Sequence, residues 1–212
     1  MTADKNAPSE AFGEGQVAGD ITKHDLEALL FAAGRPVEIE SLMGCLRGRG
    51  EVQADVVLQN LRELEREFPI DGPRGFEVVE VAGGWCMRTN RNAEPVLSGL
   101  FDTAETLRLS PAAYETLAVI AYLQPVSRRK ITEIRGVNSD SPLRTLVERD
   151  LIVEVGRAEQ TGQAVLYGTT SRFLILFGLR TLADLPPLES FEVPAEERAE
   201  LLRRLGTLSA PD

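Results

Sequence analysis

Histidine and cysteine are scarce in this chain, and their scarcity argues against several classes of enzyme. His24 is the only histidine among 212 residues, and Cys45 and Cys86 are the only cysteines. A structural zinc site takes about four ligands, mostly Cys and His, and a Cys/His nucleophile pair requires the two side chains to meet. The chain also has no phosphate-binding G-x-x-x-x-G-K-[ST] motif and no G-x-G-x-x-G motif. We therefore predict a protein that is not an enzyme, with no catalytic residue, metal or cofactor; an enzyme using Cys86 is the remote alternative.

Long apolar segments are missing as well. No run of 18 or more apolar residues occurs, so no transmembrane helix is predicted. The stretch from Met1 to Asp20 is polar, Gly-rich and acidic, and it does not have the basic-then-apolar pattern of a secretion signal. We expect a cytoplasmic protein with no membrane or small-molecule partner, in which both thiols stay reduced.

Basic charge is also limited. The formal net charge is −10, and only segment 110–180 is a long stretch with a positive balance, nine Lys or Arg against seven Asp or Glu. A protein that holds a phosphate backbone by charge needs a basic face, because much of its affinity comes from neutralised phosphates. Tight, independent DNA binding is therefore disfavoured.

The first half of the chain has the pattern of three helices followed by a β-hairpin. Apolar residues recur at helical spacing in three segments, and two short segments then alternate as strands do. A tight hairpin turn is predicted at Gly83-Gly84. The expected helices and strands are, in order, Lys23–Ala33, Glu38–Leu46, Val57–Phe68, Phe76–Val81 and Trp85–Thr89.

The same order recurs about 85 residues later, which indicates an internal duplication. A helix through Tyr114 stops at Pro125, and the third helix of this set is expected to begin with Ser141 as N-cap and Pro142 at its first position. A short apolar helix, Thr170–Leu179, follows the second hairpin. The other expected elements are the helices Lys130–Arg135 and Asn138–Arg149 and the strands Ile152–Val155 and Val165–Thr169.

These patterns predict an α+β, mainly α fold: two tandem winged helix-turn-helix domains with disordered acidic N-terminal and C-terminal tails. The predicted boundaries are a tail at 1–22, a first domain at 23–92, a linker at 93–109, a second domain at 110–180 and an acidic tail at 181–212. A Leu201, Leu202, Leu205 stripe in that tail could pack back or engage a partner.

Two clusters in the second domain are candidate functional features. Arg128, Arg129 and Lys130 lie where the first helix turns into the second, a position beside the nucleic-acid backbone in DNA-binding helix-turn-helix proteins. They either contact a phosphate or a partner, or form a solvated helix start. Gly136 fits a turn that needs positive φ, and a Glu115–Arg135 pair is expected to brace that turn, with a surface role for Arg135 as the alternative.

Taken together, the motifs of the second half resemble the family of segregation and condensation protein B. The resemblance is dense over about 110–188 and weaker over 24–92, and Ser127 and Arg129-Lys130 depart from the residues common in the family. It is carried by E-T-L-A-V-I-A-Y at 115–122, Q-P at 124–125, S-R at 127–128, I-R-G-V-N-S at 134–139, L-I at 151–152, G-R at 156–157, L-Y-G-T-T at 166–170, F-L at 173–174, F-G-L at 177–179 and P-P-L at 186–188.

The resemblance implies a non-catalytic subunit of the bacterial structural-maintenance-of-chromosomes (SMC) condensin. Such a subunit forms a homodimer, chiefly through its first domain, and binds the kleisin subunit ScpA, which links it to the SMC ATPase. It supports chromosome condensation and segregation at the nucleoid, and it contacts DNA indirectly or weakly. The alternative from another class is a winged-helix transcriptional regulator that binds DNA.

The kleisin contact is expected to be a helix laid in a groove of the second domain. The residues proposed for it are Arg128, Arg135, Val137, Tyr167, Phe173 and Phe177. For the dimer we expect the first domain to contribute Leu26, Leu29, Leu30, Leu42 and Trp85. Glu115 and Gly136 are expected to be structural.

Overall fold

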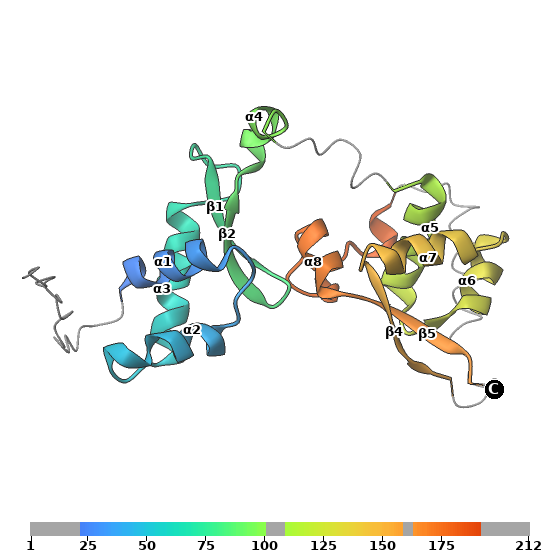
Figure 1. Ribbon diagram of the computed structural model, residues 1–212, viewed down its shortest axis with the longest axis horizontal. Helices are drawn as coiled ribbons and strands as arrows, with labels where there is room; N and C mark the ends of the chain where they lie inside the picture. The colour runs from blue at the N-terminus through green and yellow to red at the C-terminus, as the bar shows by residue number, and fades with distance from the viewer. Residues whose placement is uncertain (1–21, 101–108, 159–162, 192–212) are drawn as a thin grey trace, which may run out of the picture.

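A computed structural model describes residues 22–100, 109–158 and 163–191. Within these ranges the chain folds as a mixture of helices and antiparallel β-hairpins, which agrees with the α+β fold class. Figure 1 shows the elements gathered in two groups, which we call the N-terminal unit, residues 22–100, and the C-terminal unit, residues 109–191. The predicted elements of the first and second halves fall in the N-terminal and C-terminal units respectively.

The N-terminal unit packs three helices against one face of a hairpin. Leu26 and Leu30 of α1 and Leu61 of α3 are fully enclosed and form one core cluster with Trp85 of β2. Burial of such side chains is worth about 1.5–3 kcal/mol each relative to exposure. The elements are α1 (Lys23–Ala33), α2 (Ile39–Leu46), a 3₁₀ turn (Arg47–Arg49), α3 (Ala54–Glu67), β1 (Phe76–Val81), β2 (Gly84–Thr89), a second 3₁₀ turn (Arg91–Ala93) and α4 (Glu94–Leu97).

The first hairpin turns one residue earlier than the sequence predicts. Its two turn residues are Ala82 (φ 51°) and Gly83 (φ 75°), and Gly84 is the first residue of β2. Gly84 is needed there because Val37 pairs with Trp85 through two 2.9 Å backbone hydrogen bonds. A Cβ on Gly84 would lie 2.9 Å from the backbone of Val37. The glycine therefore serves close approach of two chain segments, not the turn.

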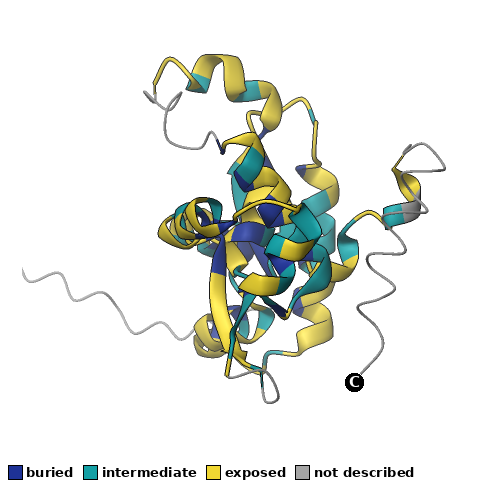
Figure 2. Cartoon of the chain, turned by 90° about the vertical axis from the view of Figure 1, so that its right-hand side faces the viewer, coloured by how far each residue is buried: buried dark blue, intermediate teal, exposed yellow. Residues whose placement is uncertain are grey.

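The C-terminal unit repeats the order of helices and hairpin. Its core includes Leu117 and Ile120 of α5, Ile131 of α6 and Leu146 of α7, all almost fully buried. Figure 2 shows the buried positions gathered between the helices, with exposed positions on the outer faces. The elements are α5 (Pro111–Leu123), β3 (Val126–Ser127), α6 (Arg128–Arg135), α7 (Asp140–Glu148), β4 (Ile152–Arg157), β5 (Val165–Thr169) and α8 (Ser171–Phe177), followed by the 3₁₀ turns Leu182–Asp184 and Leu188–Ser190.

Two local features of this unit differ from the prediction. Helix α7 begins at Asp140 with Ser139 as N-cap, so Ser141 is not the cap and Pro142 is the third helical residue. Asn138 explains the shift, because its side-chain oxygen accepts the Asp140 N–H at 2.7 Å and ends the turn there. The strand β3 was not predicted; it adds Val126 and Ser127 to the hairpin by pairing with β5, in the order β3-β5-β4.

The end of the described chain returns to α5. The Tyr122 hydroxyl donates a 2.7 Å hydrogen bond to the carbonyl oxygen of Pro186. The ring of Phe191 lies edge-on to Tyr122, with 6.5 Å between ring centroids. Residues 186–191 are therefore held beside the C-terminal half of α5.

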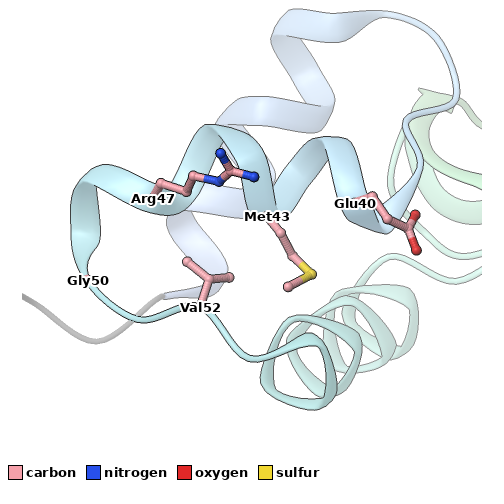
Figure 3. A pocket seen from close by; sticks show the side chains of 5 residues that line it. All are labelled: Glu40, Met43, Arg47, Gly50 and Val52. Carbon is pink, nitrogen blue, oxygen red and sulfur yellow. The ribbon is translucent and has the colours of Figure 1, made fainter.

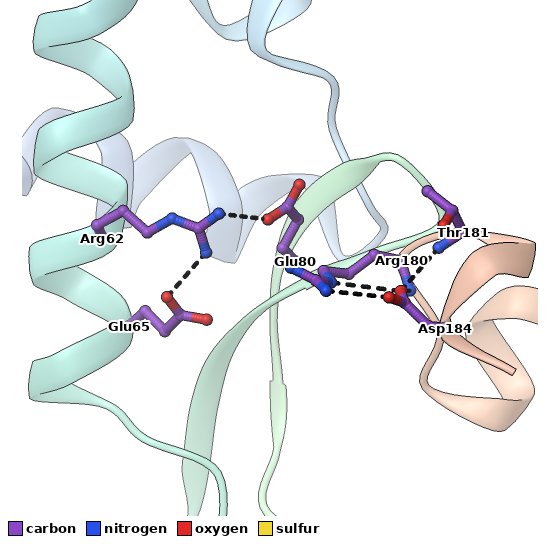
Figure 4. A network of polar contacts seen from close by, with 6 residues as sticks. All are labelled: Arg62, Glu65, Glu80, Arg180, Thr181 and Asp184. Atoms are coloured by element: carbon purple, nitrogen blue, oxygen red, sulfur yellow. Dashed lines mark hydrogen bonds and ion pairs between the residues drawn. The ribbon is translucent and has the colours of Figure 1, made fainter. Parts of the chain in front are cut away.

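The two units touch where the first hairpin turn meets the segment after α8. The N–H groups of Ala82 and Gly83 donate to the carbonyl oxygens of Leu179 and Arg180, at 2.9 and 3.0 Å. Figure 4 shows the charged side chains around this contact: Arg62 binds Glu65 and Glu80 in the N-terminal unit, and Arg180 binds Asp184. The Arg180 hydrogen bond lowers the pKa of the Asp184 carboxyl below its usual range. The contact between the two units is thus made by backbone hydrogen bonds, and the charged side chains around it are paired with opposite charges.

Candidate partner-binding site

A hollow between α5, α8 and the start of β4 is the strongest candidate for a partner-binding site. It has a volume of about 260 Å³, and its apolar walls come from Leu109, Tyr114, Leu151, Leu176 and Phe177. Tyr114 is 51% exposed and Phe177 44% exposed, although both are large apolar side chains. We call this hollow the α5/α8 groove. Apolar side chains left half-exposed around a concave surface are typical of a site that another segment covers.

Two arginines stand at the α5/α8 groove. Arg149 follows the end of α7, and Arg172 lies in the first turn of α8. Neither forms an ion pair within the part of the chain that the structure describes, and the Nη1 atom of Arg149 is enclosed without a hydrogen-bond partner. A buried unpaired donor costs on the order of 1–3 kcal/mol. The groove therefore favours an occupant that brings a carboxylate beside apolar side chains.

Only one of the residues that the sequence assigned to kleisin binding lies in this groove. That residue is Phe177. Phe173 is 3% exposed and belongs to the core, where its ring packs on Phe177 at 4.7 Å. Tyr167 is half-buried in β5, and Val137 is 55% exposed in the turn before α7. The other groove residues were not predicted from the sequence. For Leu176 the sequence did hold a signal, because segment 173–179 has more apolar residues than one helix face can bury.

Arg135 is a brace within the C-terminal unit, as the structural interpretation of the sequence predicts. Its side chain is only 4% exposed, and its guanidinium binds the Glu115 carboxylate of α5 at 3.0 Å. It also donates to the Ser139 hydroxyl at 3.1 Å. Gly136 ends α6 with φ 71°, in the left-handed region predicted for it. Arg135 therefore holds α5, α6 and the turn before α7 together and presents little surface to a partner.

Two of the three cations in the basic cluster Arg128–Lys130 are paired within their own unit, and the third, Arg129, is exposed without an acidic partner among the described residues. Arg128 binds Asp140 at 2.6 Å, which joins the start of α6 to the start of α7. Lys130 binds Glu133 at 3.3 Å. Ser127 caps α6 by accepting the Lys130 N–H. The charges available to a nucleic-acid backbone at this place are therefore fewer than the sequence indicates.

The side chains that the sequence proposed for dimerisation point into the core of the N-terminal unit. Leu26, Leu30, Leu42 and Trp85 are at most 1% exposed, and Leu29 is half-buried. These side chains are occupied by their own chain, because the helical stripe that looks apolar in the sequence is the stripe that covers the hairpin. Of the proposed set only Leu29, which is half-buried, has side-chain surface left for a partner.

An exposed apolar patch lies elsewhere on the N-terminal unit. Phe31, near the end of α1, is 78% exposed and lines a hollow of about 440 Å³ with Phe76 and Met87. Phe76 stacks on Phe68 with ring centroids 5.2 Å apart. We call this surface the Phe31 patch. A second hollow, of about 380 Å³, lies between α2 and the start of α3, where Met43 and Val52 face each other (Figure 3).

The two cysteine thiols differ in exposure. Cys45 is exposed on α2, and Cys86 is buried in β2, where burial raises the pKa of its thiol. A raised pKa keeps the thiol protonated and unreactive. No group of His, Cys, Asp and Glu that could hold a metal ion occurs in residues 22–100, 109–158 and 163–191. Over the same ranges, no helix is long and apolar enough to cross a membrane.

Comparison with known sequences assigns this chain to a family. The sequence profile described as "Segregation and condensation complex subunit ScpB" matches residues 24–188, and the chain belongs to this family. The family is non-catalytic and serves chromosome segregation and condensation, as the resemblance in the sequence indicated.

Individual relatives are similar in sequence to this chain over most of their length. The segregation and condensation protein B of Desulforamulus reducens is 45% identical over 177 residues, which cover 84% of this chain and 94% of that protein. Its counterpart from Geobacillus kaustophilus is 44% identical over 188 residues, 88% of this chain and 84% of that protein. The crystal structure of ScpB from Mycobacterium tuberculosis is 36% identical and covers 74% of this chain and 94% of that one, with a TM-score of 0.36.

Proposed function

We propose that this protein is a subunit of the SMC condensin that acts as a homodimer and binds the kleisin ScpA, through which it associates with the SMC ATPase at the nucleoid. The two units would be tandem winged-helix domains, the first for dimerisation and the second for the kleisin. DNA contact would be indirect or weak. Membership of the family supports this assignment, and the α5/α8 groove is the observation that carries the kleisin contact.

The α5/α8 groove suits an amphipathic helix of the kleisin. Its walls supply apolar surface from α5 and α8, where Tyr114, Leu176 and Phe177 are all more than 40% exposed. An amphipathic helix binds by placing residues at i, i+3, i+4 and i+7 in such a groove. Arg149 and Arg172 at the groove would pair with acidic residues of that helix, which adds orientation to the apolar contact.

Leu176→Glu is expected to weaken kleisin binding by about 30-fold or more, because a central apolar residue of an interface is worth about 2 kcal/mol or more. Isothermal titration of the full chain with ScpA measures the effect. Val153→Glu is the matched control: Val153 is 45% exposed on β4 and Leu176 is 43% exposed, yet only Leu176 lines the groove. If the two variants weaken ScpA binding equally, or if neither weakens it, the groove is not the kleisin contact.

The Phe31 patch is our proposed dimer interface in place of the buried leucines. Phe31 is the most exposed large apolar side chain among the described residues, and Phe76 of β1 and Met87 of β2 line the same hollow. Aromatic residues and methionine are enriched at the centres of protein interfaces. An isologous contact through this patch would place the same hollow of both chains face to face.

Phe31→Glu is expected to convert the homodimer into a monomer, because two buried carboxylates would face each other across the two-fold axis. Size-exclusion chromatography with light scattering would show the mass fall from two chains to one, with an unchanged circular dichroism spectrum. Ile70→Glu is the control, since Ile70 is 60% exposed but does not line the patch. A dimer that survives Phe31→Glu would place the interface elsewhere.

The alternative, a DNA-binding regulator, is not favoured. Arg128 and Lys130 are both paired with acidic residues of the C-terminal unit. Sequence-specific readout would also need Arg, Lys, Asn or Gln on the exposed side of α7, and there Arg144 lies 3.9 Å from Glu148.

A further inference from the structure

The α5/α8 groove is complementary to one segment of the same chain. We propose that residues 193–206, in the C-terminal tail, bind this groove and compete with the kleisin helix for it. The competition rests on the function proposed above, whereas the binding of the tail does not. Three independent observations support the tail as occupant: the charge at the groove, the pattern of the tail sequence, and the place where the described chain ends.

The charge at the groove calls for an occupant that brings a carboxylate to it. Arg149 and Arg172 line it without an ion pair in the described ranges, and Nη1 of Arg149 is enclosed and unbonded. The groove walls beside these arginines are apolar and include Tyr114 and Phe177. An occupant that satisfies both features carries a carboxylate next to aliphatic side chains.

The tail has this combination. Residues 193–206 read V-P-A-E-E-R-A-E-L-L-R-R-L-G, with three glutamates, three arginines and three leucines, and all three glutamates precede the leucines. At helical spacing, Glu197, Leu201 and Leu205 are four residues apart and fall on one stripe. Neighbours on such a stripe have Cβ atoms about 5–6 Å apart, so a carboxylate would lie one turn from the first leucine. The sequence thus offers one acidic and two apolar groups on one side.

The tail begins within reach of the groove. The described chain ends at Phe191, whose ring lies against Tyr122 on α5. Tyr114, a wall of the groove, is on the same helix eight residues earlier, about 12 Å along the helix axis. Four extended residues, 192–195, span up to about 13 Å. Glu196 and the residues after it can therefore arrive at the groove without displacing residues 186–191.

A tethered segment needs little intrinsic affinity to occupy its site. A short flexible tether gives an effective concentration on the order of 1 mM. A tail that binds with a dissociation constant near that value fills half of the grooves and halves the apparent affinity for the kleisin. Tighter binding by the tail gives a proportionally larger effect. We expect the kleisin to bind about two- to tenfold more tightly when the tail cannot bind.

The test compares the full chain with Leu201→Asp/Leu205→Asp, which removes the apolar stripe and leaves the groove intact. The first measurement is hydrogen exchange of the α8 amides without the kleisin, which should be several-fold faster in the variant. Ala199→Asp is the control, because Ala199, two residues before Leu201, lies outside the stripe at helical spacing and should leave exchange unchanged. Unchanged exchange in the double variant would overturn the proposal. Protection that grows with protein concentration would also overturn it, because the tail would then come from a second copy.

The second measurement is titration of the same variants with ScpA. Tighter binding by Leu201→Asp/Leu205→Asp, together with faster exchange, supports competition at the groove. Faster exchange with unchanged kleisin affinity overturns the competition. If no variant binds the kleisin at all, the proposed function fails, and the exchange experiment alone decides the binding of the tail.

Discussion

Trp85→Ala is expected to lower the free energy of unfolding by about 3–5 kcal/mol, the usual cost of removing a large aromatic side chain from a core. Trp85 is 1% exposed and packs among the helices of the N-terminal unit. The Arg62 guanidinium also lies 4.7 Å from the centre of its ring, a cation–π contact that the variant loses. Urea unfolding followed by far-UV circular dichroism measures the change; fluorescence is unsuitable, because Trp85 is the only tryptophan.

Two controls separate a core residue from an interface residue. Trp85→Phe keeps an aromatic ring and should cost clearly less than Trp85→Ala. Phe31→Ala removes an aromatic side chain that is 78% exposed within its own chain. At a protein concentration low enough to keep the chains monomeric, it should change the unfolding free energy by no more than about 0.5 kcal/mol. The opposite outcome, an unchanged stability of Trp85→Ala with loss of the dimer, would restore the interface role that the sequence assigned to Trp85.

Arg135→Ala is expected to lower the free energy of unfolding by about 2–3 kcal/mol, because a hydrogen bond to a charged group contributes about 1.5–3 kcal/mol. The variant also loses the packing of the Arg135 side chain, which is only 4% exposed. Thermal unfolding of the full chain, followed by circular dichroism, would show the loss.

The matched controls for Arg135 test its geometry. Arg135→Lys keeps the charge but cannot hold Glu115 and Ser139 with one planar group, so it should restore only part of the stability. Glu115→Gln should cost less, because the Glu115 side chain is 64% exposed and exposed ion pairs are worth about 0–1 kcal/mol. A stable Arg135→Ala variant that no longer binds ScpA would show instead that Arg135 is a partner contact.

The elements of the fold were largely predictable from local patterns. The amphipathic period of α1 and α3, the start of α8 after Thr170 and the left-handed Gly136 all lie where short-range rules put them. The misses have long-range causes. The turn at Ala82-Gly83 was misplaced because Gly84 is required by Val37, 47 positions earlier, and that contact is invisible to any local rule.

Site residues were harder to predict than elements, and α1 and α8 show why. Period alone says that Leu26, Leu30 and Phe31 of α1 are apolar, but only packing decides that the leucines face the hairpin and that Phe31 faces outward. On α8, Phe173 and Phe177 look equivalent in the sequence. Their rings touch, yet Phe173 completes the core and Phe177 lines the groove.

By itself the sequence determined the class of fold, the absence of catalytic motifs and the family, because these depend on residue types and on spacings within single elements. The tertiary structure decided which apolar side chains are left over for a partner. Among the described residues it also decided which cations have an acidic partner: Arg128, Lys130 and Arg135 do, whereas Arg149 and Arg172 line the α5/α8 groove without one. Burial and charge pairing are properties of contacts between distant residues, and only the folded chain brings those residues together.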